Sequence, residues 1–214
     1  MVKRILRLFV IGIVLAGHAA TAAAQNVAAG ARGSSATRLE IAPGTKASYR
    51  VREQLLGFNF PNDAVGTTQS VSGSITIAPD GAVASGSKIT VDLRTLKSDD
   101  DRRDNYLRDR TLQTNQSPFA EFVARRLTGL PVPIPTSGKA TLQLVGDMTV
   151  HRVTSEIVWA IDATLAQDRV TGQAKTNFPF AKFGLILPRL PGLLSVDDNI
   201  RLELDLVLRR SDAS

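Results

Sequence analysis

The densest group of side chains that could do chemistry lies in the segment LKSDDDRRDNYLRDR, residues 96–110, which holds five Asp, four Arg and one Lys. Carboxylates at this density can bind calcium or serve as catalytic acids and bases. An EF-hand calcium loop, however, needs oxygen ligands at alternate positions and a carboxylate at position twelve. Counted from Asp99, Arg103 takes the fifth position and Arg110 takes the twelfth. The segment is therefore not expected to bind calcium.

A short helix explains this segment better. The acidic run from Asp99 to Asp101 would lie in its first turn, where the helix dipole favours negative charge, and Ser98 can cap it. Two acid–base pairs have the four-residue spacing of neighbours on a helix, with the acid first: Asp99–Arg103 and Asp104–Arg108. Because Tyr106 and Leu107 are its only apolar side chains, we expect a solvated, ion-paired helix that lies across the rim of the fold.

Other groups with catalytic potential are sparse. The chain has no Cys and only two His, and His18 lies in the leader described next, so His151 alone cannot form a multi-His metal site. No Gly-x-Ser-x-Gly motif is present. We therefore predict no metal, no catalytic residue and no enzymatic activity, and we expect His151 to form a hydrogen bond at a turn or strand end. An exported hydrolase that uses His151 and rim carboxylates stays open as an alternative.

The chain begins with the pattern of a signal peptide. Three basic residues among the first seven precede an apolar run, Leu8 to Ala16, and small residues follow up to Ala24. The run is shorter than the about 20 residues that span a bilayer. We predict that residues 1–24 are a signal peptide cleaved near Ala24 and that the mature protein is periplasmic or secreted. Removing 24 of the 214 residues leaves 190, enough for a core without disulfides.

The charge of the mature chain limits the class of partner. The formal net charge of +6 falls to +3 when the three basic residues of the signal peptide are removed. Nucleic-acid binding depends on the neutralisation of many phosphates, so this small excess does not predict it. Attraction to anionic lipid headgroups fits an exported protein better, and transient contact with a membrane surface is a further hypothesis.

Beyond the leader, the dominant pattern is an alternation of apolar and polar residues, which is typical of half-buried antiparallel strands. The clearest strand, IRLELDLVLRR, places five aliphatic residues on one face: Ile200, Leu202, Leu204, Leu206 and Leu208. Eight segments are expected to be strands: residues 47–55, 70–78, 88–93, 119–127, 139–150, 156–166, 168–180 and 200–210. Residues 25–45 show no period and are predicted to be a flexible lead-in. The sequence thus predicts one all-β domain over residues 46–210, a barrel or a sandwich.

Two aromatic clusters and one irregular apolar segment could surround a cavity. The clusters GFNFPN and NFPFAKFG contribute five Phe: Phe58, Phe60, Phe178, Phe180 and Phe183. These rings are expected either to fill the core or to line an apolar cavity. The segment FGLILPRLPGLLSV, residues 183–196, is strongly apolar, but its Pro and Gly residues exclude a regular strand. Such a segment is expected to cover the mouth of a barrel or to contact lipid.

The order of several motifs resembles that of the YceI-like family, exported lipocalin-like proteins associated with polyisoprenoid binding. The matching segments are VSGSITI, SKITVDLRTLKSD, RDNYLR, PFAEF and GDMTVHRVT, and the resemblance extends over about residues 46–210. One departure follows His151. The family usually has Gly at the next position, which suggests a tight turn, whereas this chain has Arg152.

The resemblance implies an eight-stranded antiparallel lipocalin-like barrel with one or two short helices at its rim. Its apolar lumen would hold an isoprenoid chain, of the quinone or polyprenol type, in a carrier or sequestering protein that has no cofactor and no catalytic activity. An interaction module with a solid core is the remaining alternative. The inner strand faces and the mouth supply the candidate ligand-binding residues: Tyr49, Val51, Phe58, Phe60, Ile75, Ile89, Val91, Leu107, Phe122, Leu144, Ile157, Trp159, Ile161, Phe178, Phe180 and Phe183.

Overall fold

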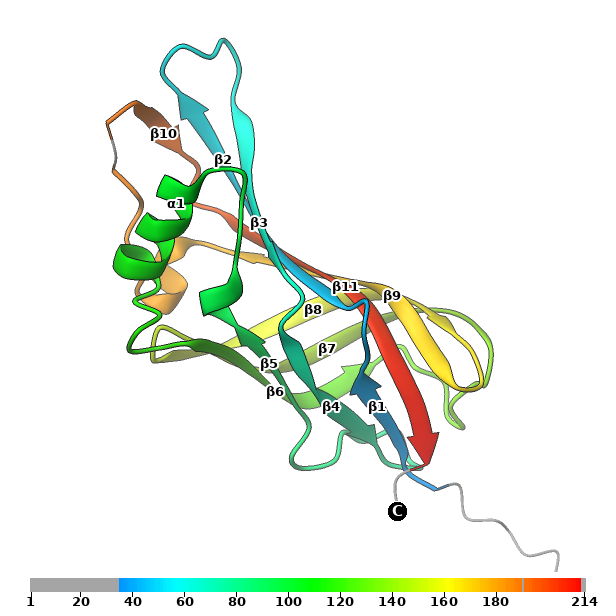
Figure 1. Ribbon diagram of the computed structural model, residues 1–214. Helices are drawn as coiled ribbons and strands as arrows, with labels where there is room; N and C mark the ends of the chain where they lie inside the picture. Colours follow the sequence, from blue (N-terminus) through cyan, green and yellow to red (C-terminus); the bar gives the residue numbers. More distant parts are fainter. Residues whose placement is uncertain (1–34, 190, 213–214) are drawn as a thin grey trace, which may run out of the picture. The chain divides into compact units, whose positions relative to one another are not determined.

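The computed structural model describes residues 35–189 and 191–212, so the predicted signal peptide and the first part of the lead-in lie outside the described residues. Eight strands form a ring: β1 (Thr37–Ile41), β4 (Val71–Ile77), β5 (Lys88–Asp92), β6 (Phe119–Thr128), β7 (Gly138–Val150), β8 (Val153–Leu165), β9 (Arg169–Phe178) and β11 (Ile200–Asp212). Neighbours in this order pair antiparallel, and β1 also pairs with β11, which closes the ring (Figure 1). The predicted eight-stranded antiparallel barrel is confirmed.

Three further strands extend the sheet beyond one end of the ring. β2 (Lys46–Leu55) continues along β11 where β1 stops, forms a hairpin with β3 (Asn62–Thr68) and pairs near its tip with β10 (Leu193–Val196). Figure 1 shows this hairpin projecting past the ring with β10 beside it. Two segments separated by more than a hundred residues of sequence therefore meet at this end of the barrel.

The charged segment forms a short helix at the same end. A 3-10 turn, η1 (Leu93–Thr95), leads from β5 to α1 (Asp101–Tyr106), and a π-helical turn, η2 (Leu107–Thr111), follows directly. Another 3-10 turn, η3 (Phe180–Phe183), follows β9. Figure 1 places α1 beside the β2–β3 hairpin and β10, so we call this end of the barrel the α1 end. None of the helices within the described ranges is long and apolar enough to cross a bilayer.

Alternation of residue types gives each strand one face toward the barrel interior. In β8 every second residue from Ile157 to Leu165 is buried and the residues between them are exposed, as the sequence predicts. A two-residue turn joins β7 to β8, and both its residues, His151 and Arg152, have left-handed backbone conformations with φ of 49° and 66°. Such a turn matches the twist of paired strands. The tight turn is therefore retained although Arg152 stands where the family usually has Gly.

Two parts of the sequence prediction are wrong. The predicted flexible lead-in, residues 25–45, contains β1, so the barrel begins at Thr37 and not at residue 46. Leu39 and Ile41 alternate with charged residues in this strand, but five residues are too few to establish a period. The prediction also omitted β3 and β10. β3 contains few large apolar side chains, and β10 has only four residues in a segment rich in Pro and Gly.

Candidate functional site

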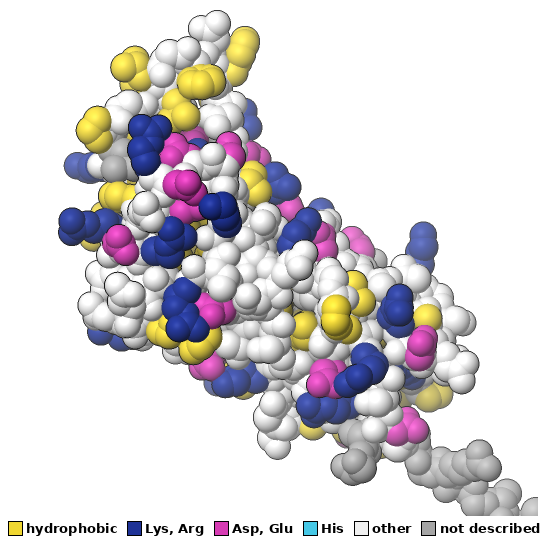
Figure 2. Space-filling view, in the orientation of Figure 1, with side chains coloured by type: hydrophobic (Ala, Val, Ile, Leu, Met, Phe, Trp, Pro, Cys, Tyr) yellow, Lys and Arg dark blue, Asp and Glu magenta, His cyan; other side chains and the backbone are white. Residues whose placement is uncertain are grey.

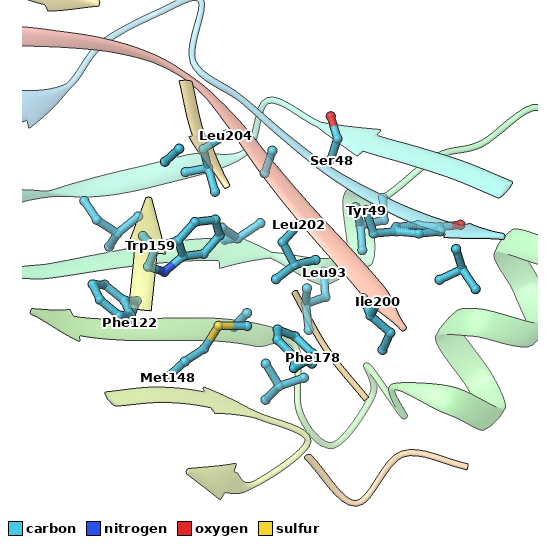
Figure 3. Close-up of a pocket in the computed structure, with 18 of the residues that line it drawn as sticks. Ser48, Tyr49, Leu93, Phe122, Met148, Trp159, Phe178, Ile200, Leu202 and Leu204 are labelled. Carbon is cyan, nitrogen blue, oxygen red and sulfur yellow. The ribbon is translucent and has the colours of Figure 1, made fainter. Parts of the chain in front are cut away.

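The barrel interior contains a cavity of about 810 Å³. This volume lies within the range of about 300–1,000 Å³ that is usual for small-molecule sites. The five alternating aliphatic residues of β11, Ile200 to Leu208, all line the cavity. Figure 3 shows Trp159, Met148 and Leu202 pointing into the same interior space from different strands. The core is therefore hollow, in contrast to the solid core that the interaction-module alternative assumes.

The structure places thirteen of the sixteen predicted residues at the cavity wall. They are Tyr49, Val51, Phe58, Ile75, Ile89, Val91, Leu107, Phe122, Leu144, Trp159, Ile161, Phe178 and Phe180. Phe122 and Trp159 form an edge-to-face pair with ring centroids 6.3 Å apart and an interplanar angle of 84°. Contact of these side chains with a ligand stays a prediction.

Three predicted residues lie away from the wall. Phe60 is 79% exposed at the tip of the β2–β3 hairpin. Phe183 is fully buried and packs against Phe178 with ring centroids 4.8 Å apart. Ile157 is buried on the inner face of β8 but does not line the cavity. Alternation identifies the inner face of a strand, but it does not show where the interior is open and where side chains fill it.

Several wall residues escaped the sequence analysis. Leu39 and Ile41 come from β1, which was assigned to the lead-in, and Leu130 and Ile134 come from the Pro-rich loop between β6 and β7. Arg210 holds this loop in place, because its guanidinium donates to the carbonyl oxygens of Pro135 at 2.6 Å and of Ile134 at 3.4 Å. Since Leu39 pairs with Arg210, this loop closes the cavity at the end where β1 meets β11, which we call the β1 end.

The α1 end of the cavity has a polar rim made of ion pairs. Arg103 of α1 donates from Nη2 to Oε1 of Glu53 on β2 at 2.9 Å, and the two side chains are only 20% and 10% exposed. Arg103 also pairs with Asp99, which confirms that predicted pair. Arg102 pairs with Asp100 at 3.3 Å. The two arginines of α1 that line the cavity are thus both neutralised by carboxylates.

The charged helix is less solvated than predicted. Asp104 is only 2% exposed, and its carboxylate accepts hydrogen bonds from the backbone N–H and the hydroxyl of Ser98 at 2.9 and 2.7 Å. The predicted Asp104–Arg108 pair is wrong, because Arg108 donates to Asn105 Oδ1 instead. The N-cap is Asp100 and not Ser98. Spacing along the helix predicts which charged side chains can pair, but packing against the barrel determines which of them are buried.

Tyr49 lies beside this rim and carries an unsatisfied hydroxyl. Its cross-strand partner is Gly66, where a Cβ atom would come within 2.1 Å of the tyrosine ring, so any larger residue there would force the ring to move. The hydroxyl is buried and has no hydrogen-bond partner among the described residues. Burial raises the pKa of Tyr49 to about 12, with Arg103 opposing the rise and Asp104 adding to it. Figure 3 shows the hydroxyl pointing toward the helix and away from Trp159.

His151 lies in the β7–β8 turn and does not line the cavity. Its Nε2 atom is buried and has no hydrogen-bond partner in the described part of the chain, so the hydrogen bond expected there is not formed at this nitrogen. Residues 35–189 and 191–212 also contain no group of three or more His, Cys, Asp or Glu side chains that could hold a metal ion. Within the described residues, Nε2 of His151 therefore has no carboxylate partner of the kind that the hydrolase alternative requires.

Comparison with protein families gives a match to the YceI-like domain over residues 41–208. The chain belongs to the YceI-like family. The match begins at the last residue of β1 and ends within β11, so it spans seven of the eight ring strands in full or in large part. No curated protein sequence matches this YceI-like chain significantly.

Solved structures with a similar fold include a polyisoprenoid binding domain from Saccharophagus degradans implicated in plant cell wall breakdown. It is 15% identical, with a TM-score of 0.62, and the alignment covers 82% of this chain and 98% of that domain. Burkholderia cenocepacia BcnA is 13% identical, with a TM-score of 0.56 and coverage of 78% and 96%. A Campylobacter jejuni YceI protein is 16% identical, with a TM-score of 0.50 and coverage of 74% and 94%. At these identities the similarity concerns the fold.

Proposed function

We propose that this protein is exported and that its mature form binds an isoprenoid lipid of the quinone or polyprenol type, as a carrier or sequestering protein and not as an enzyme. The observation that carries the proposal is the cavity of about 810 Å³, whose wall consists mainly of apolar side chains from the ring strands. The ligand class is supported by the similar fold of a polyisoprenoid binding domain and by membership of the YceI-like family.

The chemistry of the wall suits a long apolar chain. Burial of one methylene group contributes about 0.8 kcal/mol, so a few isoprene units supply the free energy of binding without any specific polar contact. Aliphatic residues of β11 and the aromatic pair Phe122–Trp159 supply this apolar surface. An isoprenoid chain in the cavity would contact both aliphatic and aromatic side chains.

The polar rim gives the bound lipid a direction. A head group would face the α1 end, where Glu53, Arg103 and Tyr49 lie at the cavity wall. Because Arg102 and Arg103 are already paired with carboxylates, this rim offers a phosphate no uncompensated positive charge. We therefore expect an uncharged head, such as a quinone ring or an alcohol, to be preferred. Binding of a prenol and of its phosphate ester with the same tail, measured side by side, tests this preference.

Native mass spectrometry of the purified protein, followed by organic extraction, tests the proposed ligand class. A mass increment that disappears on extraction and yields an isoprenoid supports the proposal. A protein without a bound lipid that also takes up no quinone or polyprenol in titration contradicts it. Export is tested separately by sequencing the N-terminus of protein recovered from the periplasm or the medium. Gln25 is the expected first residue, and retention of Met1 contradicts cleavage near Ala24.

A further inference from the structure

Large apolar side chains are exposed together at the α1 end. We call them the apolar tip: Leu56, Phe58, Phe60, Ile186, Leu187 and Leu194. The most exposed are Ile186 at 82% and Phe60 at 79%. The tip comes from two segments that touch, because Leu193 pairs with Leu55 and the backbone N–H of Leu56 donates to the carbonyl of Gly192 at 2.8 Å. Figure 2 shows apolar side chains gathered at the end that carries the hairpin and β10.

The apolar tip is continuous with the cavity. Leu56 and Phe58 belong to the tip and also line the cavity. Pro188 and Leu193, which are neighbours in sequence of tip residues, line the cavity as well. The exposed and the buried apolar surfaces therefore meet at the end of the cavity, and a lipid chain could pass between them without crossing a polar barrier on this side. Exposed apolar surface on this scale marks a site of interaction.

The charges near the tip indicate what kind of surface it contacts. No charged residue lies between Glu53 and Asp63 in the hairpin, and Arg189 is the only one in the apolar segment 183–196. The charges that flank the hairpin are paired, Glu53 with Arg103 and Asp63 with Arg201. These two segments therefore carry no cluster of basic residues that would hold the tip to anionic phosphates. Contact through the tip itself depends on burial of apolar side chains.

We propose that the apolar tip inserts into the boundary between headgroups and acyl chains of a lipid bilayer, and that an isoprenoid moves between this bilayer and the cavity beside the tip. The second part rests on the proposed function. Apolar side chains inserted to this boundary give reversible surface binding, in contrast to a spanning segment. The six side chains of the tip are few compared with the about 20–30 residues on each side of a stable protein interface. A bilayer needs no complementary shape, so it fits a projecting hairpin better than a second copy of this chain does.

Because the chain contains no Cys, a single introduced thiol reports on the tip alone. Phe60→Cys and, as the control, Val158→Cys on the outer face of β8 are each labelled with an environment-sensitive fluorophore. With phosphatidylcholine vesicles, the label at position 60 should shift to shorter wavelength and brighten, and the label at position 158 should not. The response should change less than twofold when phosphatidylglycerol or salt is added. No response at position 60, or a response only with phosphatidylglycerol at low salt, overturns the proposed mode of insertion.

A triple variant tests the same surface without altering the cavity wall. Phe60→Ser, Ile186→Ser and Leu194→Ser together change three exposed residues that do not line the cavity. This variant should lose at least tenfold in partition to vesicles and in the rate of quinone transfer from them, with unchanged equilibrium quinone binding. Val123→Ser with Val158→Ser is the matched control and should behave as the parent.

Two outcomes overturn the proposal. One is that the triple variant partitions to vesicles as well as the parent does. The other is that the parent sediments as a dimer and the triple variant as a monomer. If the parent protein binds no quinone, the proposed function is contradicted, but the partition of the tip to vesicles is still a valid result.

Discussion

Different interactions stabilise the two ends of the cavity. At the β1 end, the guanidinium of Arg210 donates to two backbone carbonyls of the loop between β6 and β7. At the α1 end, side-chain carboxylates hold the helix, above all in the Glu53–Arg103 pair. A buried hydroxyl without a partner, that of Tyr49, also lies at the α1 end.

This difference indicates which end exchanges ligand. A loop held through its own backbone must change its chain path to open. A helix held by paired side chains can separate from the barrel without a change in its own chain path, and water can then solvate the freed charges of Glu53 and Arg103. The exposed apolar side chains lie at the α1 end as well. We infer that the β1 end is the closed base of the cavity and that the α1 end is its entrance, and four predictions test this comparison.

The largest effect is expected in the middle of the cavity, which both ends share. Trp159→Ala should lower the free energy of unfolding by about 3–5 kcal/mol, because it removes a buried ring that packs on Phe122. It should also weaken quinone binding. Trp159→Phe should separate the two effects by keeping most of the stability. Urea unfolding and quinone titration measure them, and saturable binding that leaves the emission of Trp159 unchanged would place the ligand elsewhere.

A pH-dependent effect of Tyr49 is expected at the α1 end. The pKa of Tyr49 is about 12 in the folded chain and about 10 when it is unperturbed. Below pH 10 the phenol is protonated in both states, and above it the unfolded chain ionises first. The free energy of unfolding should therefore fall by about 2 kcal/mol as the pH rises from 10 to 12. Tyr49→Phe should remove this part of the alkaline loss in urea titrations, and an identical pH profile in both proteins would contradict the assignment.

Breaking one contact at each end compares the two closures directly. Glu53→Gln and Arg210→Gln should each cost about 1–3 kcal/mol, since each leaves partly buried polar groups without their charged partner. Stopped-flow fluorescence of Trp159 should show faster quinone release in Glu53→Gln and an unchanged rate in Arg210→Gln. Faster release from the Arg210 variant alone would reverse the assignment of base and entrance.

The smallest effect concerns the outer face of the helix. Asp99→Asn and Asp101→Asn remove exposed pairs with Arg103 and Lys97 and should each cost only about 0.3–0.5 kcal/mol. The same change at the buried Asp104 should cost more, about 1–3 kcal/mol, because its carboxylate accepts hydrogen bonds from Ser98. Thermal unfolding of the three variants measures the order. A melting temperature that rises with calcium and loses this dependence in the Asp99 variant would restore the metal hypothesis.

The sequence identified most of the barrel because strand alternation is a local pattern. The alternating residues of β8 and β11 do face inward, and most predicted wall residues line the cavity. Short strands gave too few residues for a period, so β1 was missed although it closes the ring with β11. Alternation also cannot distinguish an inward residue that is packed by its neighbours from one that lines the cavity. Ile157 and Phe183 were therefore predicted at the wall but are buried away from it.

What the sequence by itself determined is the set of inward faces and the position of the charged helix between strands. The tertiary structure decided between the hollow and the solid interior, which the sequence had left open, and it alone showed that Asp104 and Glu53 are covered and that Phe60 projects to solvent instead of lining the cavity. The physical reason is that strand alternation and helix formation depend on residues close in sequence. Cavity volume, the burial of a charge and the exposure of an apolar tip depend on how strands from β1 to β11 meet in space.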